Sequence, residues 1–205
     1  MISLRHIFTT LALAAGTVVS IPGPISGGPA QLKMRTVVRV VDGDTVRLDD
    51  GERVRLLGID TPERGDKLYA QAGDYLRTLV LNRKVGLEFD HTRRDPYRRL
   101  LAHLWTGDTL VNELMVASGF ARLYIWPPDT LHFSRLLAAQ TKARSKRLGV
   151  WSIVHPADES IYVIHPKRLR FHRTSCRSAP RIGLRRPLRS LLLDSGYSAC
   201  RTCKP

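Results

Sequence analysis

Short apolar runs separated by acidic turns, early in the chain, constrain the fold more than any other feature. Val37 to Val41 is a β-branched run, and Asp42-Gly43 signals a turn. Val46 to Leu48 is a second run, Asp49-Asp50-Gly51 is a second turn, and Val54 to Ile59 is a third run. This pattern predicts a β-meander. Because a meander folds back on itself, the start of its second strand and the end of its third strand become neighbours.

Two acidic residues, Asp44 and Asp60, stand at those two positions, so we expect their carboxylates to lie side by side. Close carboxylates resist joint ionisation, and a divalent cation between them removes the repulsion. A site made of oxygen atoms suits a hard ion such as Ca²⁺. Glu63 follows just past Pro62, and Arg55 lies on the strand that leads in. The set suits metal-assisted attack on a phosphodiester.

The segments that follow predict both helices and strands. Because most strands come early in the chain and most helices late, the pattern indicates an α+β fold. They are a helix over Lys67 to Asn82, strands over Val85 to Phe89 and Leu100 to Trp105, a helix over Leu110 to Ser118, an extended segment over Phe120 to Trp126, and a final helix over Thr130 to Leu148 capped by Asp129.

Three motifs resemble the staphylococcal nuclease (thermonuclease-like) family. They are V-D-G-D-T-V (41–46), R-L-L-G-I-D-T-P-E (55–63) and D-P-Y-R-R-L-L-A (95–102). The resemblance covers residues 36 to 152 and implies a five-stranded OB-fold β-barrel with three helices, an architecture used for oligonucleotides. We therefore expect one such domain over residues 34–152.

The resemblance also implies roles for the site residues. Asp44, Asp60 and the backbone carbonyl of Thr61 hold Ca²⁺, and Glu63 is the general base that takes a proton from the attacking water. Arg55 is one of two arginines that grip the scissile phosphate, because a guanidinium can stabilise the extra charge of five-coordinate phosphorus.

The second arginine is Arg99, placed by the pattern Asp-x-Tyr-x-Arg; its neighbour Arg98, where the family usually has Gly, is the alternative. Tyr97 and Tyr124 are expected to contact the substrate by stacking. For Trp126, stacking and plain core packing are both open.

The family implies a sugar-nonspecific nuclease that cuts DNA and RNA and leaves 3′-phosphate ends. A formal charge of +15, from 33 Lys and Arg against 18 Asp and Glu, suits a polyanionic partner. The alternative function is a non-catalytic OB-fold protein that binds nucleic acid. Retention of the acids and arginines favours the nuclease, which we expect to be a monomer.

Residues 1–30 read as a targeting segment and linker. Arg5 precedes a mostly apolar stretch, Ile7 to Val19, which is short for a membrane span and is followed by a Gly/Pro-rich linker. This predicts export, to a secreted, periplasmic or cell-surface location, with the segment either cleaved or kept as an anchor.

The last part of the chain, residues 160–205, has a different composition: 11 Lys and Arg face 3 acids from Ile153 onward, and all cysteines lie here. His172-x-x-x-Cys176 and Cys200-x-x-Cys203 have the spacing of a tetrahedral Zn²⁺ site. The segment resembles the zinc module of the bacterial Ada repair protein, with His172 in place of its first Cys. A disulfide is the alternative. The arginine-rich surface predicts a second contact with nucleic acid, and Leu188 to Leu193 predicts a short packed helix rather than a disordered tail.

Overall fold

The computed structural model describes residues 32–153, 161–180, 184–186 and 189–205. The predicted targeting segment, residues 1–30, lies outside the described residues. Among the helices that the structure describes, none combines the length and the apolar character needed to span a bilayer.

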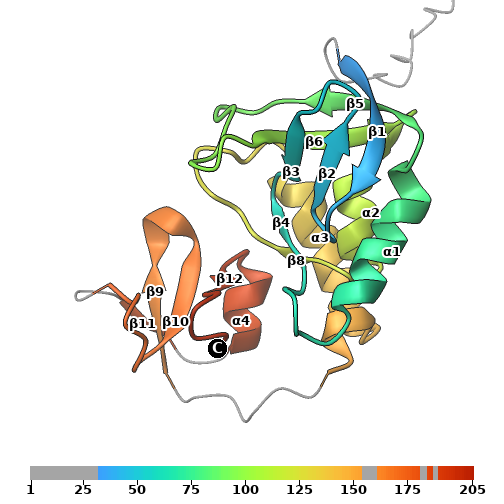
Figure 1. Ribbon diagram of the computed structural model, residues 1–205. Helices are drawn as coiled ribbons and strands as arrows, with labels where there is room; N and C mark the ends of the chain where they lie inside the picture. The colour runs from blue at the N-terminus through green and yellow to red at the C-terminus, as the bar shows by residue number, and fades with distance from the viewer. Residues whose placement is uncertain (1–31, 154–160, 181–183, 187–188) are drawn as a thin grey trace, which may run out of the picture.

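A closed β-barrel forms the larger part of the molecule (Figure 1). Its five strands are β1 (Lys33–Val40), β2 (Thr45–Leu48), β3 (Arg53–Leu56), β5 (Lys84–Glu88) and β6 (Leu100–Thr106). They pair in the order β3-β2-β1-β5-β6, and a parallel pairing of β3 with β6 closes the barrel. A short strand, β7 (Thr109–Leu110), continues from β6. The predicted α+β fold with a five-stranded barrel is confirmed.

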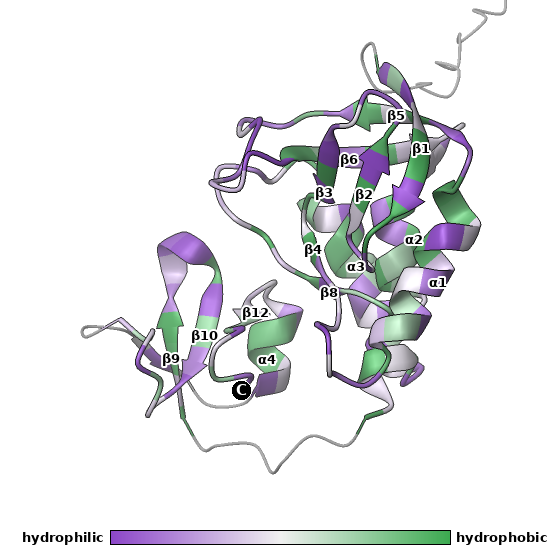
Figure 2. Ribbon diagram, viewed as in Figure 1, coloured by the Kyte–Doolittle hydropathy of each residue, from purple (hydrophilic) through white to green (hydrophobic). Residues whose placement is uncertain are grey.

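Alternation of side chains along the strands builds the barrel core. In Figure 2 the barrel strands carry hydrophilic and hydrophobic residues in turn. Val37, Val46 and Val54 are fully buried, and they come from the three strands of the predicted meander. Leu87 and Leu104 from β5 and β6 close the core from the other side. Burial of these β-branched and leucine side chains stabilises the barrel and fixes the strand register.

Three helices cover the barrel: α1 (Tyr69–Val80), α2 (Val111–Ala117) and α3 (Phe133–Ser145). On α1, Ala72, Leu76 and Val80 recur at every fourth position and are fully buried, so one helical face meets the core. All three predicted helices are present, but each is shorter at its ends than the sequence pattern indicates.

The start of α3 corrects one prediction. The helix begins at Phe133 and not Thr130, and Asp129 does not cap it. Asp129 is instead buried and accepts a hydrogen bond of 2.7 Å from the backbone N–H of Thr92. It therefore anchors the loop between β5 and β6. The sequence shows that Asp129 is a residue type that can cap a helix, but it does not show that the Thr92 N–H competes for its carboxylate.

The third predicted strand is split in two. A left-handed turn at Gly58, with φ of +74°, separates β3 from the short strand β4 (Ile59–Asp60). β4 pairs with β8 (Arg122–Leu123), which is the only strand in the segment predicted to be extended from Phe120 to Trp126. The turn carries Asp60 away from the barrel wall and toward the second part of the molecule.

Two buried amides connect these elements. The side chain of Asn112 accepts a hydrogen bond from the Leu104 N–H at 2.9 Å and donates one to the Leu57 carbonyl at 2.8 Å. Gln140 of α3 accepts a hydrogen bond of 2.9 Å from the Leu123 N–H of β8. Because buried polar groups must be paired, these contacts fix the barrel, β8 and α3 relative to one another.

The C-terminal part, which we call the C-terminal module (residues 161–205 as described), has its own small core. Strands β9 (Tyr162–His165), β10 (Arg170–Arg173), β11 (Leu184–Arg186) and β12 (Ser198–Ala199) pair in the order β11-β9-β10-β12. Helix α4 (Arg189–Asp194) confirms the predicted packed helix, and two 3₁₀ turns, η1 (Gly149–Trp151) and η2 (Pro166–Arg168), flank the junction. The module lies beside β4 and β8 (Figure 1).

Candidate active site

The turn between β1 and β2 places Asp44 at the junction of the barrel with β4 and α1. Gly43 allows this close approach, because a Cβ at its position would lie 2.8 Å from Thr61 Oγ1 and 2.9 Å from the Ala72 side chain. Asp44 is buried, and its Oδ2 accepts hydrogen bonds from the Thr61 N–H at 3.3 Å and from the Thr61 hydroxyl at 3.0 Å. The two acidic motifs of the sequence therefore meet through Thr61.

Arg55 joins the two predicted metal ligands. Its Nη2 lies 3.0 Å from Asp44 Oδ2 and 3.4 Å from Asp60 Oδ1, so both carboxylates converge on one positive group. The pKa of Asp60 is raised, mainly by burial and further by the negative charge of Asp44. The positive charges of Arg201 and Arg55 oppose this rise but do not cancel it. Burial and then the charge of Asp44 raise the pKa of Asp42. The residues thus fit a hard cation, which would supply positive charge where the carboxylates repel.

Arg99 lies on the loop before β6 and connects to Asp44 through the Thr45 hydroxyl. Its Nε donates to Asp95 at 2.7 Å, and its Nη1 lies 3.4 Å from the Thr45 hydroxyl, which in turn donates to Asp44 at 3.1 Å. Arg98 has a φ of +64°, in the left-handed region that glycine adopts most easily, which accounts for the Gly that the family usually has at this position. Its side chain is exposed. A hydrogen-bond chain through Thr45 therefore links Arg99 to Asp44, whereas the Arg98 side chain is exposed.

Glu63 lies on the exposed loop after β4. Its backbone N–H donates to Asp66 at 3.1 Å, and its carboxylate forms an ion pair with Arg201 of the C-terminal module. Arg201 Nε also lies 3.3 Å from Asp60 Oδ1. The sequence did not indicate this contact, because Arg201 stands within the Cys200-x-x-Cys203 motif, far from the acids along the chain.

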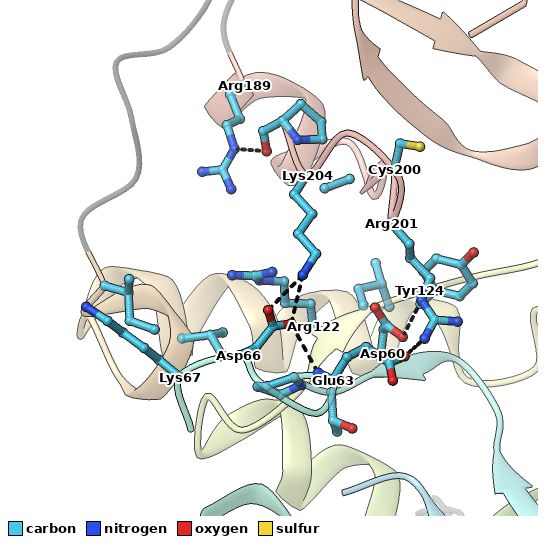
Figure 3. Close-up of a pocket in the computed structure, with 17 residues that line it drawn as sticks. Asp60, Glu63, Asp66, Lys67, Arg122, Tyr124, Arg189, Cys200, Arg201 and Lys204 are labelled. Carbon is cyan, nitrogen blue, oxygen red and sulfur yellow. Dashed lines mark hydrogen bonds and ion pairs between the residues drawn. The ribbon is translucent and has the colours of Figure 1, made fainter. Parts of the chain in front are cut away.

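These groups line a pocket of about 420 Å³ between the barrel and the C-terminal module, which we call the junction pocket (Figure 3). The barrel side supplies Asp60, Glu63 and Asp66, and the module supplies Arg201 and Lys204. Lys204 Nζ lies 2.8 Å and 2.9 Å from the two oxygens of Asp66. Acids of the barrel side therefore pair with bases of the module across the pocket, although the barrel side also supplies Lys67 and Arg122.

The aromatic residues predicted to contact substrate lie in different surroundings. Tyr97 is 71% exposed, and the Arg99 guanidinium lies 5.6 Å from its ring centroid. Tyr124 lines the junction pocket and is covered by the Arg170 guanidinium at 3.4 Å. Trp126 is 47% exposed, so core packing does not account for it. Trp105, by contrast, is 6% exposed and belongs to the barrel core.

The predicted zinc ligands come together in the C-terminal module. One ligand atom from each of His172, Cys176, Cys200 and Cys203 lies within 4.8 Å of the others, and the Cys176 and Cys200 sulfurs are 4.0 Å apart. Tetrahedral Zn²⁺ with thiolates requires sulfur atoms about 3.8 Å apart, so this arrangement fits a metal ion. All three cysteines are free, without a disulfide.

A second group of potential ligands, Asp90, His91 and Asp129, lies near the loop before β6. Its carboxylates already accept backbone hydrogen bonds from Leu131 and Thr92, at 2.9 Å and 2.7 Å. We therefore interpret these residues as holding the loop in place through hydrogen bonds, and not as a metal site.

The fold and the site together define an α+β protein with a closed OB-type barrel, on which paired carboxylates and guanidiniums can bind a cation and a phosphate. The profile described as staphylococcal nuclease homologue matches residues 53–153. A thermonuclease from Staphylococcus intermedius is 38% identical over 124 residues, which cover 56% of this chain and 74% of that protein.

A thermonuclease from Staphylococcus hyicus is 32% identical over 159 residues, covering 69% of this chain and 94% of that protein. Endonuclease YncB from Bacillus subtilis (strain 168) is 34% identical over 140 residues, covering 63% of this chain and 66% of that protein. The chain belongs to the staphylococcal nuclease family and is a nuclease-class hydrolase.

Proposed function

We propose that the chain is a Ca²⁺-dependent, sugar-nonspecific nuclease that hydrolyses phosphodiester bonds of DNA and RNA and leaves 3′-phosphate ends. The observation that carries the proposal is the convergence of Asp44 and Asp60 on a single nitrogen of Arg55, at 3.0 Å and 3.4 Å. The similarity to proteins named thermonuclease and endonuclease supports the class of reaction.

In this proposal Asp44, Asp60 and the Thr61 carbonyl hold the ion, which supplies positive charge against the scissile phosphate. Glu63 takes the proton of the attacking water; it is exposed on a loop and follows Asp60 without being needed as a ligand. Arg55 and Arg99 stabilise the negative charge that builds up on the phosphoryl oxygens. Tyr97 and Tyr124 contact the substrate on either side of these groups.

The test is a plasmid-digestion assay with Ca²⁺, with EGTA and with the Glu63→Gln variant. We expect Ca²⁺-dependent cleavage that Glu63→Gln reduces by about 10²-fold or more while DNA binding is kept, since general-base catalysis contributes this much. Glu113→Gln, which changes a half-buried carboxylate that pairs with Arg135 away from the site, is the control. End-group analysis of the fragments checks the 3′-phosphate. Cleavage that continues in EGTA would reject the role of calcium, and binding without cleavage would establish the non-catalytic alternative.

The organisation of the chain is part of the proposal. We assign residues 34–152 to the nuclease domain and residues 160–205 to a basic module whose His172, Cys176, Cys200 and Cys203 hold a structural Zn²⁺. The apolar stretch Ile7 to Val19 supports export to a secreted, periplasmic or cell-surface location. We propose a monomer, which light scattering on the purified chain tests directly.

A further inference from the structure

We propose that the C-terminal module carries a second phosphate-binding site for the substrate strand, next to the junction pocket. Arg170 and Arg168 form this site over the rings of Tyr124 and Trp126. The inference rests on the proposed function, because it extends the substrate path of the same nuclease site.

The site is a separate small pocket of about 150 Å³. Among the described residues, its lining contains three arginines, Arg168, Arg170 and Arg201, and no carboxylate. Tyr124, Cys200 and Arg201 also line the junction pocket, so the two pockets are adjacent. A strand bound at the catalytic acids can therefore extend into it. The absence of acids from the lining distinguishes this pocket from the junction pocket, where acids and bases already pair.

Arg170 is the main reason to expect an anion here. The residue is only 4% exposed, and its Nε and Nη2 are buried with no hydrogen bond of good geometry to the described residues, although Tyr124 interacts with the guanidinium. Its Nη1 donates to the Leu169 carbonyl at 3.2 Å. A guanidinium presents its donors as a planar fork that matches phosphate oxygens. Two unsatisfied donors on a buried cation need acceptors, and a phosphodiester supplies both acceptors and the compensating charge.

The rings beside Arg170 indicate a nucleic-acid strand and not a free anion. The Arg170 guanidinium lies 3.4 Å from the Tyr124 centroid and 5.7 Å from the Trp126 centroid. Arg168 lies 5.3 Å from Trp126, which is 47% exposed and open to a ligand. Aromatic faces interleaved with guanidiniums are how proteins hold single strands, with bases on the rings and phosphates on the cations.

Binding of fluorescent single-stranded DNA in EGTA tests the proposal without cleavage. The probes are a dinucleotide, which fills only the catalytic pocket, and an octanucleotide, which also reaches the second site. We expect Arg168→Ala to weaken the octanucleotide at least fivefold and to leave the dinucleotide within twofold. The slope of log affinity against log salt should fall by about 0.7, the value for one phosphate contact on a single strand.

Lys167→Ala is the matched control, because Lys167 is the exposed neighbour of Arg168 and does not line the pocket. The Lys167→Ala variant should bind the octanucleotide within twofold of the wild type, and its salt slope should be unchanged. Arg170→Lys keeps the charge but removes the fork, and it should weaken the octanucleotide where circular dichroism shows a folded protein. Since Arg168 is exposed, its variant carries the test if Arg170→Lys does not fold.

Three results would overturn the inference. Arg168→Ala could behave as Lys167→Ala does, it could weaken both probes equally, or millimolar inorganic phosphate could displace the octanucleotide as completely as unlabelled DNA. None of these outcomes depends on cleavage. A failure of the proposed function is separate, because it would show as wild-type protein that binds the probes but does not cut DNA in Ca²⁺.

Discussion

The Arg201→Ala substitution is expected to tighten Ca²⁺ binding at the proposed metal ligands, Asp44 and Asp60. Arg201 pairs with Asp60, a proposed metal ligand, at 3.3 Å, and with Glu63, the proposed base. A cation that binds at Asp60 must compete with this guanidinium and displace it. Arg55 pairs with the same acid, but its proposed role is to bind the scissile phosphate, which it would still do after the ion has bound.

The size of the effect follows from the exposure of the pairs. The Arg201 side chain is 43% exposed, against 59% for Glu63 and 20% for Asp60; because the guanidinium itself is exposed, each pair is worth about 0.2–1 kcal/mol. Displacing both pairs therefore costs about 0.4–2 kcal/mol, which corresponds to a change of about 2- to 30-fold in affinity. Screening of exposed charges predicts that the difference becomes smaller at high salt.

Isothermal titration calorimetry of the full chain with Ca²⁺ and without nucleic acid measures this affinity directly. Arg177→Ala is the matched control, because Arg177 is an exposed arginine next to Cys176 just as Arg201 is next to Cys200. The control should bind Ca²⁺ as the wild type does. Unchanged or weaker Ca²⁺ binding by Arg201→Ala would refute the competition, and it would point to a role for Arg201 in binding the substrate instead.

Three other predictions concern stability. Asn112→Ala leaves the Leu104 N–H and the Leu57 carbonyl buried without partners, so urea denaturation should show a loss of about 2–4 kcal/mol. Burial, then His132, lowers the pKa of His103 from 6.5 to about 3. The unfolded chain therefore takes up the proton first, and stability should fall by up to about 1.4 kcal/mol per pH unit from pH 6.5 toward pH 3. In His103→Gln this part of the slope should disappear. Purified protein should contain one Zn²⁺ per chain, and chelation should lower the melting temperature of the C-terminal module; a single free thiol after denaturation would show a disulfide instead.

Local signals in the sequence predict the barrel well, because its strands alternate and its turns use Asp and Gly. The meander brings Asp44 and Asp60 together, and the left-handed φ of Arg98 agrees with the family's usual Gly at that position. The boundaries were less predictable. Asp129 has the chemistry of a helix cap, but the Thr92 N–H competes for it through a contact distant in sequence. Only the folded chain decides between such partners.

The contact between the two parts of the chain could not be read from the sequence, and the reason is physical. The zinc-type spacing predicts that Cys200 and Cys203 share one ion, but it does not say which way the residues between them point. In the fold, β12 runs parallel to β10, and the turn after it directs Arg201 toward Asp60 while Cys200 faces the ligand cluster. The adjacent residues Cys200 and Arg201 thus link the proposed zinc ligands to the proposed metal ligand Asp60. If Zn²⁺ orders this turn, removing the metal should release Arg201 from Asp60, and the Ca²⁺ affinity of the chelated wild type should approach that of Arg201→Ala.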